Sequence, residues 1–202
     1  MNMQGAVKVW DPLVRIFHWS VVVAFFLAYF VEAKDETLAI HVWAGYTVLG
    51  LVVFRIIWGF VGTEHARFSD FVYPPKRVFA YAFEVLRGTA QRYLGHNPSG
   101  GAMIFLLLIM LLAINISGIA VYGADQHMGP LAGWFAGTGE GEEMEHMLEE
   151  LHEVLSNVTM VLVAIHVLGV IVESLVHKEN LVRAMFTGRK RALDAPGNPV
   201  RR

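Results

Sequence analysis

Four long apolar stretches constrain this chain more than any other feature of its sequence. They cover about residues 13–31, 38–61, 101–123 and 152–175, and the third contains no charged residue. A helix of about 20 residues crosses the roughly 30 Å hydrocarbon core of a bilayer. In a chain of 202 residues, too little sequence remains to cover four such helices in a soluble protein. The sequence therefore predicts an all-α membrane protein, a four-transmembrane-helix bundle forming a single domain over residues 1–202.

The composition excludes several other classes of protein. Charged residues make up 17% of the chain and apolar residues 55%, whereas a soluble domain carries about 25% charged residues. The net charge of −2 provides no basic surface for nucleic acid. The chain has no cysteine, which excludes disulfides, thiolate metal sites and covalently attached haem. Its nine histidines are the main metal ligands that remain.

The basic residues predict the orientation in the membrane. An even number of spans places both termini, the central loop and the tail (177–202) on one side, and that side receives 14 of the 16 lysines and arginines. The positive-inside rule assigns this side to the cytoplasm of a bacterial inner membrane. The opposite loops contain one lysine, Lys34, and are otherwise acidic. Their carboxylates are Glu32, Asp35, Glu36, Asp125, Glu140, Glu142, Glu143, Glu145, Glu149, Glu150 and Glu153.

Two segments outside the spans also have helical patterns. Between Pro74 and Tyr93, apolar residues recur at helical spacing opposite a polar face. This pattern predicts an amphipathic helix in the cytoplasmic membrane interface. On the outer side, we expect the acidic run from Glu140 to extend the fourth helix beyond the bilayer, since carboxylates are favourable near a helix N-terminus.

Four histidines lie within or at the ends of the spans, where ionisable groups are costly and usually functional. His152 and His166 are 14 residues apart, so on one helix they share a face at two depths about 21 Å apart. His41 lies near the outer start of the second span, and His18 near the cytoplasmic start of the first. Depth therefore pairs His41 with His152 and His18 with His166.

Two facing imidazoles in each layer suit haem, whose porphyrin supplies the other four ligands to the iron. Zinc or non-haem iron needs three or four protein ligands, usually including carboxylates. A single histidine in a span is more often a packing or pore-lining residue, but four at matching depths favour two haems of the b type. We expect the other five histidines to be solvated surface residues: His65, His96, His127, His146 and His177.

Two arginines near the cytoplasmic layer are candidate cofactor contacts. Arg55 shares the face of His41, and Arg15 precedes His18 by about one turn. Either guanidinium could pair with a haem propionate or contact a quinone. The alternative is that both side chains extend to the lipid headgroups. The sequence leaves the two interpretations open.

Several motifs resemble one known family over nearly the whole chain. They are VWDPLVRIFHW in the first span, IHVWAGYTVLGLVVFRIIWGFVG in the second, GHNPSGG before the third, HEVLSN and IHVLGV in the fourth, and MFTGRKR after it. Together they resemble the bacterial cytochrome b561 family, which includes the b-type subunits of nickel–iron hydrogenases. The resemblance implies a four-helix membrane bundle with two bis-histidine b haems. Its ligands match His18, His41, His152 and His166.

Haem iron with two axial histidines has no open position, so it is expected to transfer electrons and not to bind a substrate. No residue is predicted to be catalytic. The resemblance implies membrane quinone as one partner, and the acidic outer face favours a basic periplasmic redox protein, such as a c-type cytochrome, as the other. One alternative is oxidation of superoxide at the outer haem coupled to quinone reduction. An alternative of another class is a histidine-lined metal transporter or a structural haem anchor.

Overall fold

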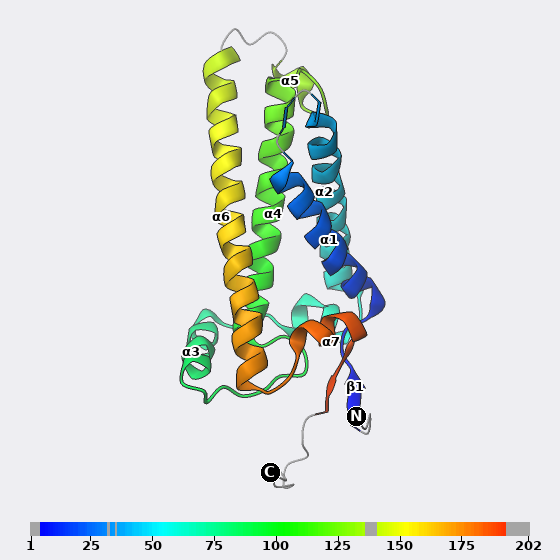
Figure 1. Ribbon diagram of the computed structural model, residues 1–202, viewed down its shortest axis with the longest axis vertical. Helices are drawn as coiled ribbons and strands as arrows, with labels where there is room; N and C mark the ends of the chain where they lie inside the picture. Colours follow the sequence, from blue (N-terminus) through cyan, green and yellow to red (C-terminus); the bar gives the residue numbers. More distant parts are fainter. Residues whose placement is uncertain (1–4, 32, 35, 136–140, 193–202) are drawn as a thin grey trace. The chain divides into compact units, whose positions relative to one another are not determined.

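The computed structural model describes residues 5–31, 33–34, 36–135 and 141–192, and most of them are helical (Figure 1). Within these residues, four helices are long and apolar enough to cross a membrane. The predicted class, an all-α membrane protein, is therefore confirmed. The helices and strands are β1 (Ala6–Lys8), α1 (Pro12–Phe30), α2 (Leu38–Val61), the 3₁₀ turns η1 (Glu64–Ala66) and η2 (Phe68–Asp70), α3 (Pro75–Leu86), α4 (Pro98–Ala124), α5 (Ala132–Phe135), α6 (Gly141–Val176), α7 (Leu181–Thr187) and β2 (Arg189–Arg191).

Two long helices begin earlier than the apolar stretches suggest. Helix α4 begins at Pro98 because proline suits the first helical position and Asn97 caps the first turn, accepting a hydrogen bond of 2.7 Å from the Gly100 amide. Helix α6 begins at Gly141 and includes the acidic run. Its 36 residues extend about 54 Å, well beyond a hydrocarbon core of roughly 30 Å. Glu140, where the extension was predicted to start, lies outside the described residues.

The contacts divide the chain into two units, whose boundaries fall inside the long helices. The first unit comprises Met1–Ile16, Ile57–Met103 and His166–Arg202, and the second comprises Phe17–Ile56 and Ile104–Ile165. Of the candidate ligands, His18, His41 and His152 belong to the second unit and His166 to the first.

The second unit is built from segments of α1, α2, α4 and α6. The Tyr29 hydroxyl on α1 donates a hydrogen bond of 2.9 Å to Asn157 on α6. On α2, Val48 and Val52 lie one turn apart and are almost wholly buried. Trp43 and Ile109 are largely exposed, as expected of side chains that face lipid rather than water.

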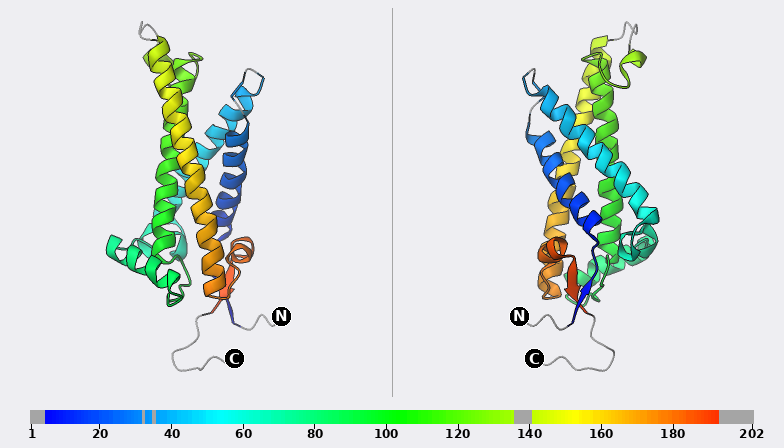
Figure 2. Two further views of the ribbon diagram at one scale, coloured as in Figure 1. Left: turned by 60° about the vertical axis from the view of Figure 1, so that its left-hand side comes forward. Right: turned by 90° about the vertical axis from the view of Figure 1, so that its right-hand side faces the viewer.

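In the first unit, a segment near the N-terminus pairs with a segment near the C-terminus. Strands β1 and β2 lie side by side as an antiparallel pair in which Val7 is opposite Lys190 (Figure 2). Helix α7 ends at Thr187 and is capped by Gly188, whose φ of +76° is the left-handed conformation that favours glycine at a helix C-terminus. The Arg92 guanidinium forms an ion pair with Glu179 at 2.8 Å, with both side chains nearly buried. No pattern in the sequence of the tail predicts these elements.

Helix α3 confirms part of the helix predicted between Pro74 and Tyr93. It ends at Leu86 because Gly88 adopts φ +69° and the Thr89 amide bonds back to the Glu84 carbonyl. The prediction was therefore wrong beyond Leu86. One face of α3 is exposed and apolar, through Phe79, Phe83 and Leu86, whereas Tyr81 on another face is completely buried. An exposed apolar strip of this kind suits the membrane interface.

Replacing Asp11 with alanine is expected to destabilise the first unit. Its buried carboxylate accepts hydrogen bonds from the Val14 amide (3.0 Å), the Thr63 hydroxyl (2.7 Å) and the Trp58 indole (3.3 Å). Burial raises the pKa of Asp11, but these bonds outweigh it and leave the pKa below its ordinary value. Its stabilisation is therefore present above the unfolded pKa and lost as the pH falls through the folded one. We expect a loss of about 1–3 kcal/mol.

Thermal unfolding in detergent at pH 7 measures this effect. Asp11→Asn keeps some acceptor capacity and should lose less than Asp11→Ala. Equal melting temperatures for the parent and Asp11→Ala would contradict the role given to Asp11.

Candidate haem-binding site

His41 on α2 and His152 on α6 come together in the second unit. Their ring centroids are 6.1 Å apart and their planes are inclined at 74°. Both side chains are half-buried. These are the two histidines that were predicted to pair near the outer face.

The carbonyls at the end of α1 orient His41. Its Nδ1 lies 2.9 Å from the Ala28 carbonyl oxygen and 3.2 Å from that of Val31. The last carbonyls of a helix lack partners within the helix, and a carbonyl can only accept. Nδ1 must therefore carry the proton, which leaves the lone pair of a neutral imidazole on Nε2.

Ser117 on α4 orients His152 in the same way. The Ser117 hydroxyl donates to the Ile114 carbonyl at 3.0 Å, and its oxygen lies 2.9 Å from His152 Nδ1. Because the hydroxyl hydrogen is already used, the serine oxygen accepts a hydrogen bond from the Nδ1 proton. Nε2 of His152 is again left with the lone pair, the arrangement in which one ring nitrogen is fixed by a hydrogen bond and the other binds metal.

The spacing of the two rings fits a shared haem iron. A metal lies about 2 Å from a coordinating imidazole nitrogen, and that nitrogen lies about 1.15 Å from the ring centre for ring bonds of about 1.35 Å. Two imidazoles on opposite sides of one iron therefore have centres about 6.3 Å apart. The observed 6.1 Å agrees with this value.

The surroundings of the pair do not suit a metal that is held by protein alone. The one cluster of at least three potential metal-ligating side chains in the described part of the chain is Glu64, His65 and Asp70, in the first unit. Zinc and non-haem iron need a third and usually a fourth protein ligand. A haem needs only two axial ligands, so this pair fits haem better.

Gly118 on α4 supplies the space for the His152 ring. A Cβ atom at this position would lie 2.9 Å from His152 Cε1 and 3.3 Å from Nδ1, closer than ordinary van der Waals contact. Ser117 and Gly118 were not predicted from the sequence. Both are small residues on an apolar helix that also contains other glycines, serines and alanines, so their presence alone does not indicate a site.

Replacing Gly118 with alanine is therefore expected to displace the His152 imidazole and weaken haem binding at this pair. Gly50 on α2 is a matched control because a Cβ there would have no neighbour within 4 Å. Both are single glycine-to-alanine changes in long apolar helices, so their effects on helix propensity should be alike. Haem content per chain after purification measures the difference, with a loss expected for Gly118→Ala only. Equal haem content in both variants would contradict this role of Gly118.

The inner pair, His18 with His166, stays a prediction because the two residues belong to different units. Each side chain is half-buried in the structure. His18 lies 4.9 Å from the indole of Trp19, measured between ring centroids.

The two candidate arginines have different surroundings. Arg15 donates a hydrogen bond to the Phe186 carbonyl at the end of α7, and among the described residues its buried Nε has no acceptor. Arg55 lies within α2 and is 3% exposed, so its side chain does not reach out to the surface in this structure.

Three of the five histidines that were expected to be solvated are not. His96 packs between Trp10 and Phe71, with both pairs of ring centroids 4.5 Å apart. His65 pairs with Asp70 at 3.0 Å, and His177 is 11% exposed and pairs with Glu173 at 3.0 Å. These contacts come from segments distant in sequence or from local turns that the spacing did not reveal. His127 and His146 are exposed, as predicted.

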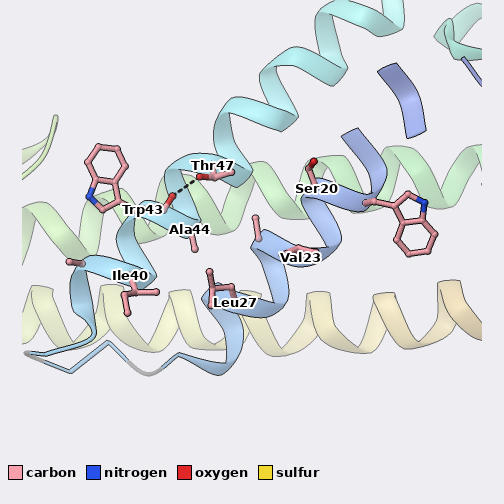
Figure 3. Close-up of a pocket in the computed structure, with 10 residues that line it drawn as sticks. Ser20, Val23, Leu27, Ile40, Trp43, Ala44 and Thr47 are labelled. Carbon is pink, nitrogen blue, oxygen red and sulfur yellow. Dashed lines mark hydrogen bonds between the residues drawn. The ribbon is translucent and has the colours of Figure 1, made fainter. Parts of the chain in front are cut away.

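An apolar groove of about 810 Å³ lies between α1 and α2 in the second unit (Figure 3). Ser20, Val23 and Leu27 line it from α1, and Ile40, Ala44 and Thr47 line it from α2. The Thr47 hydroxyl donates to the Trp43 carbonyl within α2 and is therefore already satisfied. The lining suits hydrocarbon, and we assign the groove no role in electron transfer.

The chain is similar to known proteins over most of its length. Residues 9–188 match the model of the prokaryotic cytochrome b561 family. The chain is 28% identical to a protein of Azotobacter vinelandii named "Probable Ni/Fe-hydrogenase B-type cytochrome subunit", over 93% of this chain and 90% of the relative. A protein of the same name from Rhizobium leguminosarum bv. viciae is 26% identical over 92% of this chain and 89% of the relative.

The fold and the histidine pair thus define a helical membrane protein with a site suited to b-type haem. The chain belongs to the prokaryotic cytochrome b561 family.

Proposed function

We propose that this protein transfers electrons across the bacterial inner membrane through two b haems, each ligated by two histidines. His41 and His152 ligate the outer haem, and His18 and His166 the inner one. The main support for the proposal is the geometry of the pair formed by His41 and His152. Its ring separation of 6.1 Å and its two Nδ1 hydrogen bonds suit axial ligation through both Nε2 atoms.

Haem bound in this way supplies a reversible one-electron change at an iron with no open position. The chain contributes the rest. The Ala28 carbonyl and Ser117 hold the two imidazoles in the ligating tautomer. Gly118 leaves room for the His152 ring, and the apolar helices exclude water.

The proposed partners are membrane quinone and a redox protein at the outer face. The eleven outer carboxylates favour a basic partner such as a c-type cytochrome. Glu32, Asp35 and Glu140 among them lie outside the described residues. The names of the relatives support a second candidate, a nickel–iron hydrogenase.

Difference spectra test the function directly. Reduction of the purified protein by a water-soluble quinol should give the spectrum of low-spin b haem, reversed by an oxidant. A metal transporter or a structural haem anchor would show no reversible reduction by quinol. Oxidation of superoxide much faster than electron exchange with either redox partner would support the superoxide activity instead.

The proposed orientation places both termini in the cytoplasm. A reporter fused after Arg202 should therefore report the cytoplasm, and one inserted between Gly137 and Gly141 should report the periplasm. Alkaline phosphatase and green fluorescent protein fusions at each position measure this. The same compartment for both positions would overturn the orientation and the number of spans.

A further inference from the structure

A buried group of three titratable side chains lies in the first unit, apart from the histidine pair described above. Glu173 lies in the last turn of α6 and His177 directly follows the helix, with its Nε2 3.0 Å from Glu173 Oε2. The Tyr81 hydroxyl, from α3, lies 3.3 Å from the same carboxylate oxygen and 3.5 Å from the same imidazole nitrogen. We call these three residues the Tyr–Glu–His cluster.

Burying these polar and charged groups costs folding free energy, which is hard to explain if the cluster serves stability alone. Tyr81 is completely buried, and the Glu173 and His177 side chains are 12% and 11% exposed. A carboxylate in the last turn of a helix also faces the negative end of the helix dipole. Replacing a buried ion pair with apolar residues is often neutral or stabilising, so its presence suggests a function.

The protons of the Tyr–Glu–His cluster are fewer than the hydrogen-bond acceptors within their reach. The Tyr81 hydroxyl has one hydrogen and two oxygen acceptors in reach, Glu173 and the Gln91 carbonyl at 3.1 Å. His177 Nε2 donates to Glu173 when it carries a proton. The cluster can therefore bind an additional proton by rearranging hydrogen bonds, and the exposed Gln91 lies at its edge.

Other charged and titratable groups surround the cluster. Arg77 and Glu84 on α3 pair with each other, Tyr93 packs edge-on against Tyr81, and Arg92 pairs with Glu179. The charge of Lys190 on β2 also interacts electrostatically with Glu173. Burial lowers the pKa of Lys190 to about 8, although the charge of Glu179 raises it. Burial first, and Glu173 next, raise the pKa of Tyr81, which therefore stays protonated.

The cluster shares a helix face with His166. Glu173 follows His166 by seven residues, which is about 700° of rotation and roughly 10.5 Å of rise on α6. His177 lies just past the end of α6, but its amide still bonds to the Glu173 carbonyl. It therefore continues the helical path, eleven residues after His166 and about 20° past three full turns. A negative charge added at an iron bound to His166 would therefore act on Glu173 and His177 along the same face of one helix.

We propose that the Tyr–Glu–His cluster is a proton-binding site linked to the reduction of the haem at His166. When that haem gains one electron, Glu173 and His177 together bind one proton from water, and they release it when the electron leaves. The charge added by reduction is thus compensated nearby. This inference rests on the proposed function, because it requires the inner haem.

Redox titration of the full-length protein at several pH values tests the inference. In the parent, the midpoint potential of one of the two haems should fall as the pH rises across the neutral range. The fall can reach about 59 mV per pH unit, since a tenfold change in a one-electron equilibrium corresponds to that potential. Reduction should also take up protons from weakly buffered solution, as measured with a pH indicator.

Glu173→Gln and His177→Gln should each flatten this dependence, and Tyr81→Phe should shift it along the pH axis. Glu64→Gln removes an exposed carboxylate of the same unit and should leave the dependence unchanged. Two haems with pH-independent potentials in the parent, or an unchanged slope in both cluster variants that bind haem, would overturn the inference alone. A parent with fewer than two haems would instead overturn the proposed function.

Discussion

Replacing His152 with alanine is expected to reduce the haem content from two per chain to one. In the proposed arrangement His152 ligates the outer haem, and the nearest other histidine on α6 does not share its face. His146, six residues earlier, lies about 240° around the helix. The remaining haem should keep its low-spin spectrum because its ligands, His18 and His166, are unchanged.

Haem extraction as the pyridine complex, divided by protein concentration, measures the loss. His146→Ala is the matched control, since it removes an exposed histidine from the same helix and should keep both haems. Two bis-histidine haems in the His152→Ala protein would show that the ligand assignment is wrong.

Neutralising the acidic extension of α6 is expected to slow electron exchange with a basic redox protein by about tenfold or more at low salt. The change is Glu142, Glu143, Glu149 and Glu150 to glutamine. Glu143, Glu149 and Glu150 are exposed in the structure. Complementary charge accelerates encounter, and salt screens it over about 10 Å at 0.1 M. The parent rate should therefore fall steeply as salt is added, and the variant rate should change little.

Stopped-flow reduction of a basic c-type cytochrome by the pre-reduced protein measures both effects. Haem content and the haem spectra serve as controls, since none of the substituted residues is a proposed haem ligand. If the variant keeps the parent's rate and salt dependence, these glutamates serve only to solvate α6 and complement its dipole. A nickel–iron hydrogenase in place of the cytochrome tests the other candidate partner by the same method.

The sequence predicted the long helices well because apolar composition and length decide them. The apolar stretch of α4 contains no charged residue, which is typical of a membrane helix. The sequence also indicated that His41 and His152 would meet, since the predicted topology places both near the same side of the membrane.

The details that orient the site depend on tertiary packing and were missed. Ser117 and Gly118 are unremarkable on α4 until His152 from α6 lies against them. His177 follows the last span, so it was expected to be solvated, but Tyr81 from α3 covers it. The pairing of β1 with β2 joins segments about 180 residues apart, beyond the reach of local patterns.

Electron transfer across the membrane of liposomes that contain the protein tests the proposed transmembrane electron transfer most directly. Cytochrome c is enclosed in the vesicles, and dithionite, an anion that crosses lipid poorly, is added outside. The account predicts that the enclosed cytochrome c is reduced in vesicles containing the parent protein, and much more slowly in those containing His152→Ala or no protein. Equal reduction in all three preparations, or none with a parent that holds both haems, would contradict electron transfer across the membrane through this chain.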